Sequence, residues 1–249
     1  MRYFKNGEQI LQYSYSKLTS FYDCPYAFYR NYQLHEKGEN NLFASYGILV
    51  HSILERYAKG ELKLEELKDE FVSGFELEIS DPIIMFGKDL TESYLEKGIY
   101  FFNNFKGFWG LKPLESEYKF EIELGNNTFV GIIDLILEDE KGNIIIVDHK
   151  SSSKFSKKDL KSKSKQLYLY AKAIYDKYRK FPIELWFNHF KNNHVEKIVF
   201  DKAFYDETVH WALETIEKIE TCMEFRPNNN DKFYCDYLCD YRNNCEYNE

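Results

Sequence analysis

Apolar side chains recur every three or four residues through the first 110 residues of the chain, a spacing that predicts amphipathic helices. Pro25 falls inside the first helical stretch and predicts a break just after Cys24, because proline cannot donate to the helical hydrogen-bond ladder. Ser14 or Ser16 would cap that helix at its start. We expect helices at Ser16–Tyr32, Ser45–Lys59, Leu62–Ile79 and Asp89–Phe108.

The pattern then changes to that of strands. Ser116–Leu124 alternates polar and apolar residues, as a strand with one wet face does. Two β-rich runs, Thr128–Glu138 and Asn143–Lys150, are joined by the turn sequence Asp-Glu-Lys-Gly at 139–142, which predicts a hairpin. A helix, two strands and a last helix complete the order, at Ser164–Lys180, Ile183–Phe190, His194–Phe200 and Asp201–Glu224.

This order of elements predicts an α/β fold in which a mixed central sheet is flanked by helices. We expect a single domain over residues 1–249, since no linker is long enough to mark a boundary. Its parts would be a helical segment at 1–110, a core at 111–200, and a C-terminal helix with a cysteine cluster at 201–249.

The predicted hairpin brings charged residues together. Centred on Lys141, it places Asp134 opposite Asp148, and strand alternation puts Lys150 on the same face as Asp148 while His149 points away. A register shifted by one residue would undo this geometry. Two carboxylates and a lysine would therefore converge at one end of an otherwise hydrophobic sheet.

Two buried carboxylates repel each other unless a cation or a proton lies between them. Oxygen-rich pairs suit Mg²⁺ or Mn²⁺, and a nearby lysine can orient a water molecule or stabilise charge that develops on a phosphoryl group. The alternative interpretations, both without catalytic function, are an ion pair between Asp148 and Lys150 on an edge strand and simple exposure of these side chains to solvent.

Two helical spacings point to the same region. Gly47, His51 and Glu55 follow one another at four-residue intervals, which puts His51 and Glu55 one turn apart on one side of a helix. Gln166 and Tyr170 have the same spacing on a later helix. All of these side chains could equally be structural or ordinary surface residues.

Composition narrows the classes of function. The chain has 33 Lys and Arg against 41 Asp and Glu, a net charge of −8, which excludes a general coat of DNA-binding charge. Seven lysines and one aspartate between residues 150 and 165 nevertheless make a local excess of +6, either a solvated loop or a binding surface. The sequence predicts neither a membrane span nor a secretion signal, so we expect a cytoplasmic protein without membrane contacts.

The five cysteines are unevenly spread. Cys24 lies near the N-terminus, Cys222 on a predicted helix where we expect a buried thiol, and Cys235, Cys239 and Cys245 near the C-terminus. Without a secretion signal, such a cluster is more often metal-binding than disulfide-forming.

Taken together, these motifs resemble the RecB-type branch of the PD-(D/E)XK nuclease superfamily. The resemblance rests on Gly47…His51…Glu55, Gly131-Ile-Ile-Asp134, Ile146-Val-Asp148-His-Lys150 and Gln166…Tyr170, in that order. The opening Tyr15-Ser16-x-Leu18-x-x-Phe21-x-x-Cys24-Pro25-x-x-Phe28 resembles the iron–sulfur members, which include AddB-type nuclease domains and CRISPR-associated iron–sulfur exonucleases.

The resemblance implies a restriction-endonuclease-like sheet and a role for each motif residue. His51, Asp134 and Asp148 would bind Mg²⁺ or Mn²⁺, together with the backbone carbonyl of His149. Lys150 would position the attacking water, and Gln166 and Tyr170 would support the site. Glu55 would assist His51, and Glu117 is a further candidate carboxylate. The basic segment would track the phosphate backbone through Lys154, Lys157, Lys158, Lys161 and Lys163.

The resemblance also implies that Cys24 joins Cys235, Cys239 and Cys245 in a [4Fe-4S] cluster that links the two ends of the chain. The spacing C-x3-C-x5-C departs from the more usual C-x2-C start of the family. Zinc, which binds four thiolates tetrahedrally, is the alternative at these cysteines.

The expected function is that of a divalent-metal-dependent DNA nuclease, an exonuclease acting on single strands or duplex ends. The alternative is a nucleic-acid-binding module that does not cleave and serves a larger recombination or CRISPR-type complex. A helicase, a recombination protein or an integrase would be the protein partner, since the chain has no helicase motif of its own.

Overall fold

The computed structural model describes residues 2–5, 8–39, 43–79 and 82–248. The chain forms two compact units. The first comprises residues 1–42, 121–131 and 206–249, and the second comprises residues 43–120 and 132–205. Among the described residues no helix has the length and apolar character needed to cross a membrane. The expectation of a single domain stays a prediction.

The second unit is built on a mixed sheet. Strands β6 (Asn127–Glu138), β7 (Ile144–Lys150), β8 (Glu184–His189) and β9 (His194–Val199) pair in that order. The β7–β8 pair is parallel and the other two pairs are antiparallel. Strand β5 (Lys112–Leu124) pairs with β6, and both strands continue into the first unit. The predicted hairpin register is confirmed, because Leu135 lies opposite Val147.

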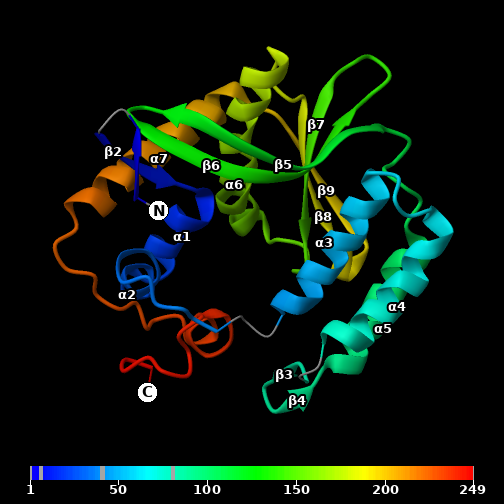
Figure 1. The fold of residues 1–249 in the computed structure, drawn as a ribbon, viewed down its shortest axis with the longest axis horizontal. Helices are drawn as coiled ribbons and strands as arrows, with labels where there is room; N and C mark the ends of the chain where they lie inside the picture. Colours follow the sequence, from blue (N-terminus) through cyan, green and yellow to red (C-terminus); the bar gives the residue numbers. More distant parts are fainter. Residues whose placement is uncertain (1, 6–7, 40–42, 80–81, 249) are drawn as a thin grey trace. The chain divides into compact units, whose positions relative to one another are not determined.

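Helices cover both faces of this sheet (Figure 1). Helices α3 (Ala44–Ala58), α4 (Leu67–Glu78) and α5 (Thr91–Asn104) pack on one face, where Leu135, Leu137, Ile145, Val147 and Trp186 join their apolar side chains in one core. Helix α6 (Lys157–Tyr178) connects β7 to the parallel β8 and lies against the other face. The α/β class with a mixed, helix-flanked sheet is thus confirmed.

One glycine lets the helices of this unit approach closely. A Cβ atom at Gly98 on α5 would lie 2.0 Å from the ring of Phe71 on α4, far inside van der Waals contact. The aromatic core beneath α3 therefore depends on the absence of a side chain at this position. Short elements complete the unit: η2 (Leu64–Glu66), β3 (Ile84–Met85), β4 (Lys88–Asp89) and η3 (Phe190–Asn192).

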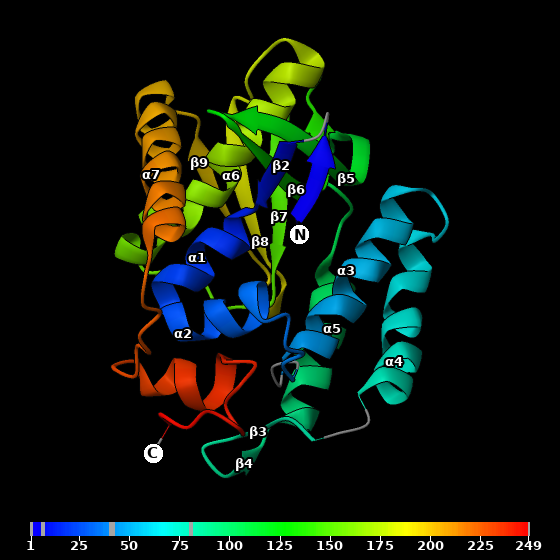
Figure 2. The same ribbon diagram turned by 60° about the vertical axis from the view of Figure 1, so that its left-hand side comes forward.

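The first unit combines the two ends of the chain. Its elements are β1 (Arg2–Lys5), β2 (Glu8–Tyr13), α1 (Tyr15–Asp23), α2 (Pro25–Phe28), η1 (Tyr29–Gln33), most of α7 (Lys202–Thr221) and η4 (Tyr234–Leu238). Ser14 caps α1, and the predicted break occurs at Cys24, whose backbone is extended. The C-terminal segment lies beside α2 (Figure 2), held by Tyr241, whose hydroxyl donates to the carbonyl of Glu36 at 2.9 Å.

Three features differ from the sequence-based expectation. Helix α6 begins at Lys157 rather than at Ser164, because the Ser156 hydroxyl accepts a hydrogen bond from the backbone of Asp159 and caps an earlier start. Strands β1 and β2 were not expected. Cys222 lies one residue beyond α7 and is half-buried, its thiol 3.3 Å from the carbonyl oxygen of Glu224.

Candidate active site

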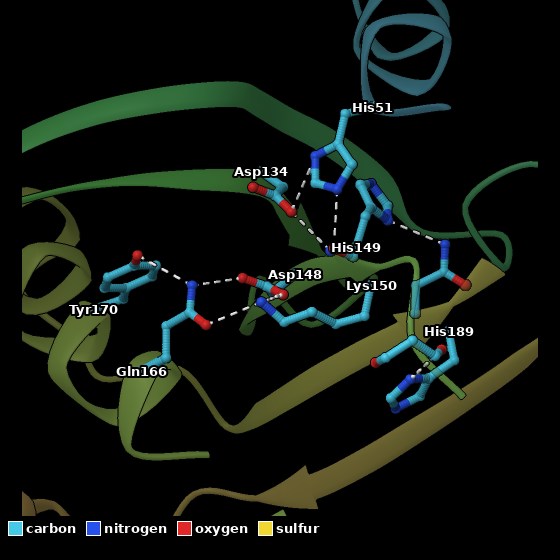
Figure 3. A network of polar contacts seen from close by, with 10 residues as sticks. His51, Asp134, Asp148, His149, Lys150, Gln166, Tyr170 and His189 are labelled. Atoms are coloured by element: carbon cyan, nitrogen blue, oxygen red, sulfur yellow. Dashed lines mark hydrogen bonds and ion pairs between the residues drawn. The ribbon is translucent and has the colours of Figure 1, made fainter. Parts of the chain in front are cut away.

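A cluster of polar side chains lies at the end of strand β7, beside the middle of β6 (Figure 3). Asp134 comes from β6, and Asp148 and Lys150 come from β7. His51 reaches them from α3, while Gln166 and Tyr170 reach them from α6. The residues predicted from four separate sequence motifs therefore lie together at one end of the sheet.

Gln166 is the centre of a hydrogen-bond network on the α6 side. Its amide nitrogen donates to Asp148 at 2.8 Å, and its amide oxygen accepts from the Lys150 ammonium at 3.0 Å. Its amide nitrogen also lies 3.1 Å from the Tyr170 hydroxyl. Because a carboxylate only accepts and an ammonium only donates, this pair of contacts fixes the orientation of the amide.

The same network fixes Lys150. Its Nζ lies 2.7 Å from Oδ2 of Asp148, an ion pair in which the carboxylate is almost fully buried and the lysine is partly exposed. Lys150 is thus held from two directions, by a carboxylate on its own strand and by an amide on α6. The position of its ammonium group is therefore fixed between Asp148 and Gln166.

His51 lies on the opposite side of Asp134. Its Nε2 is 2.9 Å from the backbone carbonyl of His149, and because a carbonyl only accepts, Nε2 carries the proton in the neutral ring. The other nitrogen, Nδ1, then presents a lone pair to Oδ2 of Asp134 at 3.6 Å. Two acceptors face each other across this gap, an arrangement that a cation or a second proton would stabilise.

Glu117 completes this group. Its carboxylate, His51 and Asp134 offer ligand atoms that all lie within 4.8 Å of one another. Glu117 has a φ of +49° in the middle of β5, a left-handed conformation that is uncommon for residues other than glycine. Such backbone strain is typical of sites where a strand turns one side chain toward a functional centre.

The carboxylates of the cluster are held in an unfavourable environment. Burial, together with the negative charge of Asp148, raises the pKa of Asp134 well above its ordinary value, although Lys150 and the backbone N–H of His149 act in the opposite direction. Burial and the Glu55 carboxylate likewise raise the pKa of Glu117. Burial lowers the pKa of His51, which favours its neutral, metal-binding form.

These residues fit a divalent cation. The donor set combines carboxylate oxygens with one neutral imidazole nitrogen, which suits Mg²⁺ or Mn²⁺. A cation would also relieve both the carboxylate repulsion and the opposed lone pairs of His51 and Asp134. The structure groups Glu117 with these two residues, whereas the oxygens of Asp148 contact Lys150 and Gln166.

Two residues near the site, Glu55 and Asn188, make contacts that the sequence did not predict. Glu55, expected to assist His51, forms an ion pair with Lys59 one turn further along α3. Asn188 on β8 was not expected; its amide donates to Nδ1 of the buried His149 ring at 3.0 Å. The polar pair Asn188-His189 ending an otherwise apolar strand was the available signal, because the end of a parallel neighbour lies beside the end of β7.

The lysines predicted to bind DNA are exposed. Lys157, Lys158, Lys161 and Lys163 lie in the first two turns of α6, and Lys154 lies in the segment just before it. The expected lysine-rich loop is therefore mostly helical. All five belong to the stretch that leads from Lys150 to Gln166.

The first unit holds the four cysteines of the predicted cluster around one small cavity. Cys24, Cys235, Cys239 and Cys245 all line it, with Cys24 and Cys239 buried. Among the residues that the structure describes, no three cysteine sulfurs lie within 4.8 Å of one another, so a closed four-cysteine metal site is not shown. Cys222 lies outside this cavity lining.

The cost of burying the Asp134 charge predicts a measurable effect on the melting temperature of the protein. The folded state binds the Asp134 proton more tightly than the unfolded chain, whose carboxyl has an ordinary pKa near 3.8. The tighter binding of this proton stabilises the folded state fully below the pKa of the unfolded chain. That stabilisation is lost as the pH rises through the raised pKa of the folded state. Asp134→Asn should therefore melt at a higher temperature than the wild type at pH 7 without divalent cations, by about 2–4 °C per kcal/mol of relieved repulsion.

The measurement is thermal unfolding in a chelator between pH 4 and pH 8. Asp176→Asn is the matched control, because Asp176 is partly exposed and paired with Lys172, so its replacement relieves no buried charge. A melting temperature of Asp134→Asn at or below that of the wild type at pH 7 would contradict the prediction.

Comparisons with known proteins identify the superfamily of the chain. The family model of the PD-(D/E)XK nuclease superfamily matches residues 12–246. No curated protein matches the chain. A crystal structure from Eubacterium rectale, described as that of a presumed exonuclease, is 13% identical with a TM-score of 0.50, covering 87% of this chain and 84% of its own.

A second solved structure, that of the protein SSO0001, is 14% identical over 99% of this chain and 90% of its own, with a TM-score of 0.42. The iron–sulfur branch is not distinguished by these comparisons. The family match, which spans nearly the whole chain and includes every residue of the sheet-end cluster, establishes that the chain belongs to the PD-(D/E)XK nuclease superfamily.

Proposed function

We propose that this protein is a divalent-metal-dependent DNA nuclease that hydrolyses phosphodiester bonds as an exonuclease, on single strands or at duplex ends. The observation that carries the proposal is the juxtaposition of two groups at one sheet end. One is the ligand group of His51, Glu117 and Asp134, and the other is the Lys150 ammonium fixed by Asp148 and Gln166.

The first group would hold the metal. His51, Asp134 and Glu117 would bind Mg²⁺ or Mn²⁺, with Asp148 and the carbonyl of His149 as further ligands implied by the family motifs. When bound, the ion supplies Lewis-acid stabilisation of the charge on the phosphate. The neutral tautomer of His51 is set by its hydrogen bond to the His149 carbonyl, which leaves Nδ1 free to act as a ligand.

The second group would act on the reacting phosphate. Lys150 forms an ion pair with the Asp148 carboxylate, and Gln166 fixes the direction of its ammonium. A positive charge held in place before the reaction stabilises negative charge that develops on the phosphoryl oxygens, without the cost of reorganisation. The same ammonium can donate a hydrogen bond that orients the attacking water.

The direct test is incubation of the purified protein with end-labelled single-stranded and double-stranded DNA, with and without Mn²⁺. Mn²⁺-dependent release of labelled nucleotides supports the proposal. Binding of DNA without cleavage under any metal condition would instead favour the non-cleaving module of a larger complex.

Replacing either residue of the ion pair should remove cleavage. We expect Asp148→Ala and Lys150→Ala to lower the cleavage rate at least about 100-fold, because the first removes the partner that fixes the ammonium and the second removes the ammonium itself. Both variants should keep the circular dichroism spectrum of the wild type. Lys172→Ala, which breaks a partly exposed pair elsewhere on α6, is the control and should cleave normally. Near-wild-type rates in either site variant would refute the assignment.

The exposed lysines of α6 provide a surface for the DNA backbone. Four of them, at 157, 158, 161 and 163, lie within seven residues of one another on a helix whose later turns carry Gln166. Positive charge next to a phosphodiester-cleaving site neutralises phosphates and releases counterions, which increases affinity at low salt.

Neutralising this surface should change the salt dependence of binding. Substitution of Lys157, Lys158, Lys161 and Lys163 by Gln should weaken DNA binding and reduce the slope of log K against log salt by about 0.7–0.9 for each phosphate that is no longer neutralised. The measurement is fluorescence anisotropy over a range of salt concentrations. Substitution of Lys63, Lys68, Lys88 and Lys106 by Gln removes the same charge elsewhere and should leave the slope unchanged. Equal slopes in the two variants would speak against the surface.

The cavity lined by cysteines supports a metal cluster in the first unit. Burial raises the pKa of Cys239, and the three other cysteines add to that shift, so the four thiols lie close enough to influence one another. Backbone N–H groups of Asn228 and Tyr241 donate to the sulfurs of Cys24 and Cys239 at 3.4 Å. Such bonds stabilise thiolates in iron–sulfur sites.

The spacing of the sulfurs favours the iron–sulfur cluster over zinc. With Zn–S bonds of about 2.3 Å, a tetrahedral site places its sulfurs about 3.8 Å apart. Among the described residues, no three of the cysteine sulfurs lie within even 4.8 Å of one another. No three of the sulfurs are therefore spaced as a zinc site would hold them, and the [4Fe-4S] cluster implied by the family motifs is the proposal.

The cluster proposal predicts a coloured protein. Preparations made without oxygen should contain iron and absorb visible light, and Cys24→Ala should lose the colour and make residues 227–249 more susceptible to proteolysis. Cys222→Ala is the control and should keep both properties, since Cys222 lies outside the cavity. Metal analysis that finds zinc, or no metal, would exclude the iron–sulfur cluster.

A further inference from the structure

His189 is a buried histidine that the proposed chemistry leaves unexplained. It is the last residue of β8, its exposed fraction is 0%, and the parallel register pairs it with Lys150 at the end of β7. Figure 3 shows its ring below the strand end that carries Lys150. A wholly buried imidazole needs partners for both ring nitrogens.

One side of the His189 ring forms a hydrogen bond with the connecting segment, residues 151–156, which follows Lys150. Its Nδ1 lies 3.2 Å from the carbonyl oxygen of Ser152 and donates to it. The ring of Phe155 packs edge-on against the imidazole, with ring centres 4.7 Å apart. Ser152 and Phe155 both lie between the end of β7 and the start of α6. One buried side chain therefore holds this connecting segment by a hydrogen bond and a ring contact.

The other side of the ring faces a carboxylate. Nε2 lies 3.4 Å from Oε2 of Glu196 on β9, and neither atom has a hydrogen-bond partner among the described residues. Since Nδ1 donates to Ser152, Nε2 and the carboxylate must have a proton between them, or two acceptors would face each other in a buried place. One shared proton makes the pair neutral overall. Glu196 thus fixes the orientation of His189, as carboxylates commonly do for functional histidines.

The connecting segment links β7, which carries Lys150, to α6, which carries Gln166. Lys150 is the residue just before it, and Gln166, which accepts from the Lys150 ammonium, lies on the helix just after it. A segment composed largely of serine and lysine has few apolar contacts of its own to fix it. Phe155 contacts both His189 and Phe187 of β8, and the Ser152 carbonyl contacts His189, so His189 makes two of these three contacts between the segment and the sheet.

We propose that His189, oriented by Glu196, is a positioning residue that holds the segment after Lys150 and thereby aligns the lysine with Asp148 and Gln166. This inference rests on the proposed nuclease function for its effect on rate. The hydrogen bond itself does not depend on that function, so the two ideas can be tested separately.

The test compares two substitutions of His189 with a structural control. His189→Asn retains a side-chain amide that can donate from nearly the position of Nδ1, whereas His189→Leu fills the space without a donor. Leu185→Ala is the control, because Leu185 is a fully buried residue of the same strand and side of the sheet, two pairs of residues away from the site. It should lower the melting temperature but leave the rate unchanged well below that temperature.

We expect His189→Leu to lower kcat about 10–100-fold, the range found when supporting residues of an active site are removed. KM for DNA should stay within about twofold, because the four lysines of the proposed DNA surface lie on α6, beyond this segment. His189→Asn should recover most of the lost rate. If His189→Leu keeps the wild-type kcat, or His189→Asn is as slow as His189→Leu, the inference is wrong. A loss of rate in Leu185→Ala equal to that in His189→Leu would also overturn it, since stability alone would explain both.

Hydrogen exchange provides a readout that needs neither metal nor DNA. The amides of residues 153–155 should exchange faster in His189→Leu than in the wild type, and near the wild-type rate in His189→Asn. Unchanged exchange in His189→Leu would refute the proposed contact. An inactive wild type whose exchange follows the predicted pattern would refute the nuclease proposal while supporting the attachment of the segment to His189.

Discussion

The repulsion between Asp134 and Asp148 is the constraint around which the second unit is organised. The β6–β7 hairpin places both carboxylates at one end of a hydrophobic sheet, where burial makes each charge more costly. Several neighbouring groups reduce that cost, although the Glu117 carboxylate adds to it. The backbone N–H of His149 donates to Asp134, and Lys150 and Gln166 contact Asp148. Helices α3 and α6 supply the remaining polar partners from the two faces of the sheet.

This arrangement separates two tasks. Asp148 is paired within the protein and serves to fix a positive charge, while Asp134, together with His51 and Glu117, retains unbalanced negative charge that a cation would neutralise. A site of this kind is less stable when empty than an apolar one would be. Such local instability is common at functional centres, and the aromatic core of α3, α4 and α5 packs against the same two strands.

Much of this cluster could be predicted from local sequence patterns. The turn at 139–142 and the alternation of two strands were enough to place Asp134, Asp148 and Lys150 together, since hairpin register is a local property. The four-residue spacing of Gln166 and Tyr170 gave their common helix face. Glu117 was named as a candidate, but its left-handed backbone was not foreseeable, because it depends on how β5 pairs with β6.

The contacts of the β8 side chains could not be predicted from the sequence either, because they too depend on how distant strands pair. Asn188 and His189 contact residues about forty positions earlier in the chain, through a parallel pairing that a helix connects. The start of α6 was misplaced because lysines mask the helical pattern, whereas the single cap at Ser156 decides it. The mutual approach of four cysteines, from residue 24 to residue 245, likewise depends on how the ends of the chain pack in the first unit.

The lysine-rich start of α6 has a consequence for the free protein. The positive end of a helix dipole lies at its N-terminus, so cationic side chains there are unfavourable and only Asp159 in the first turn opposes them. The opening turns of α6 therefore carry an unfavourable electrostatic interaction in the free protein. Under the proposed function, a phosphate chain bound to these lysines would offset that interaction, and the turns that lead to Gln166 would be more stable with DNA bound than without it.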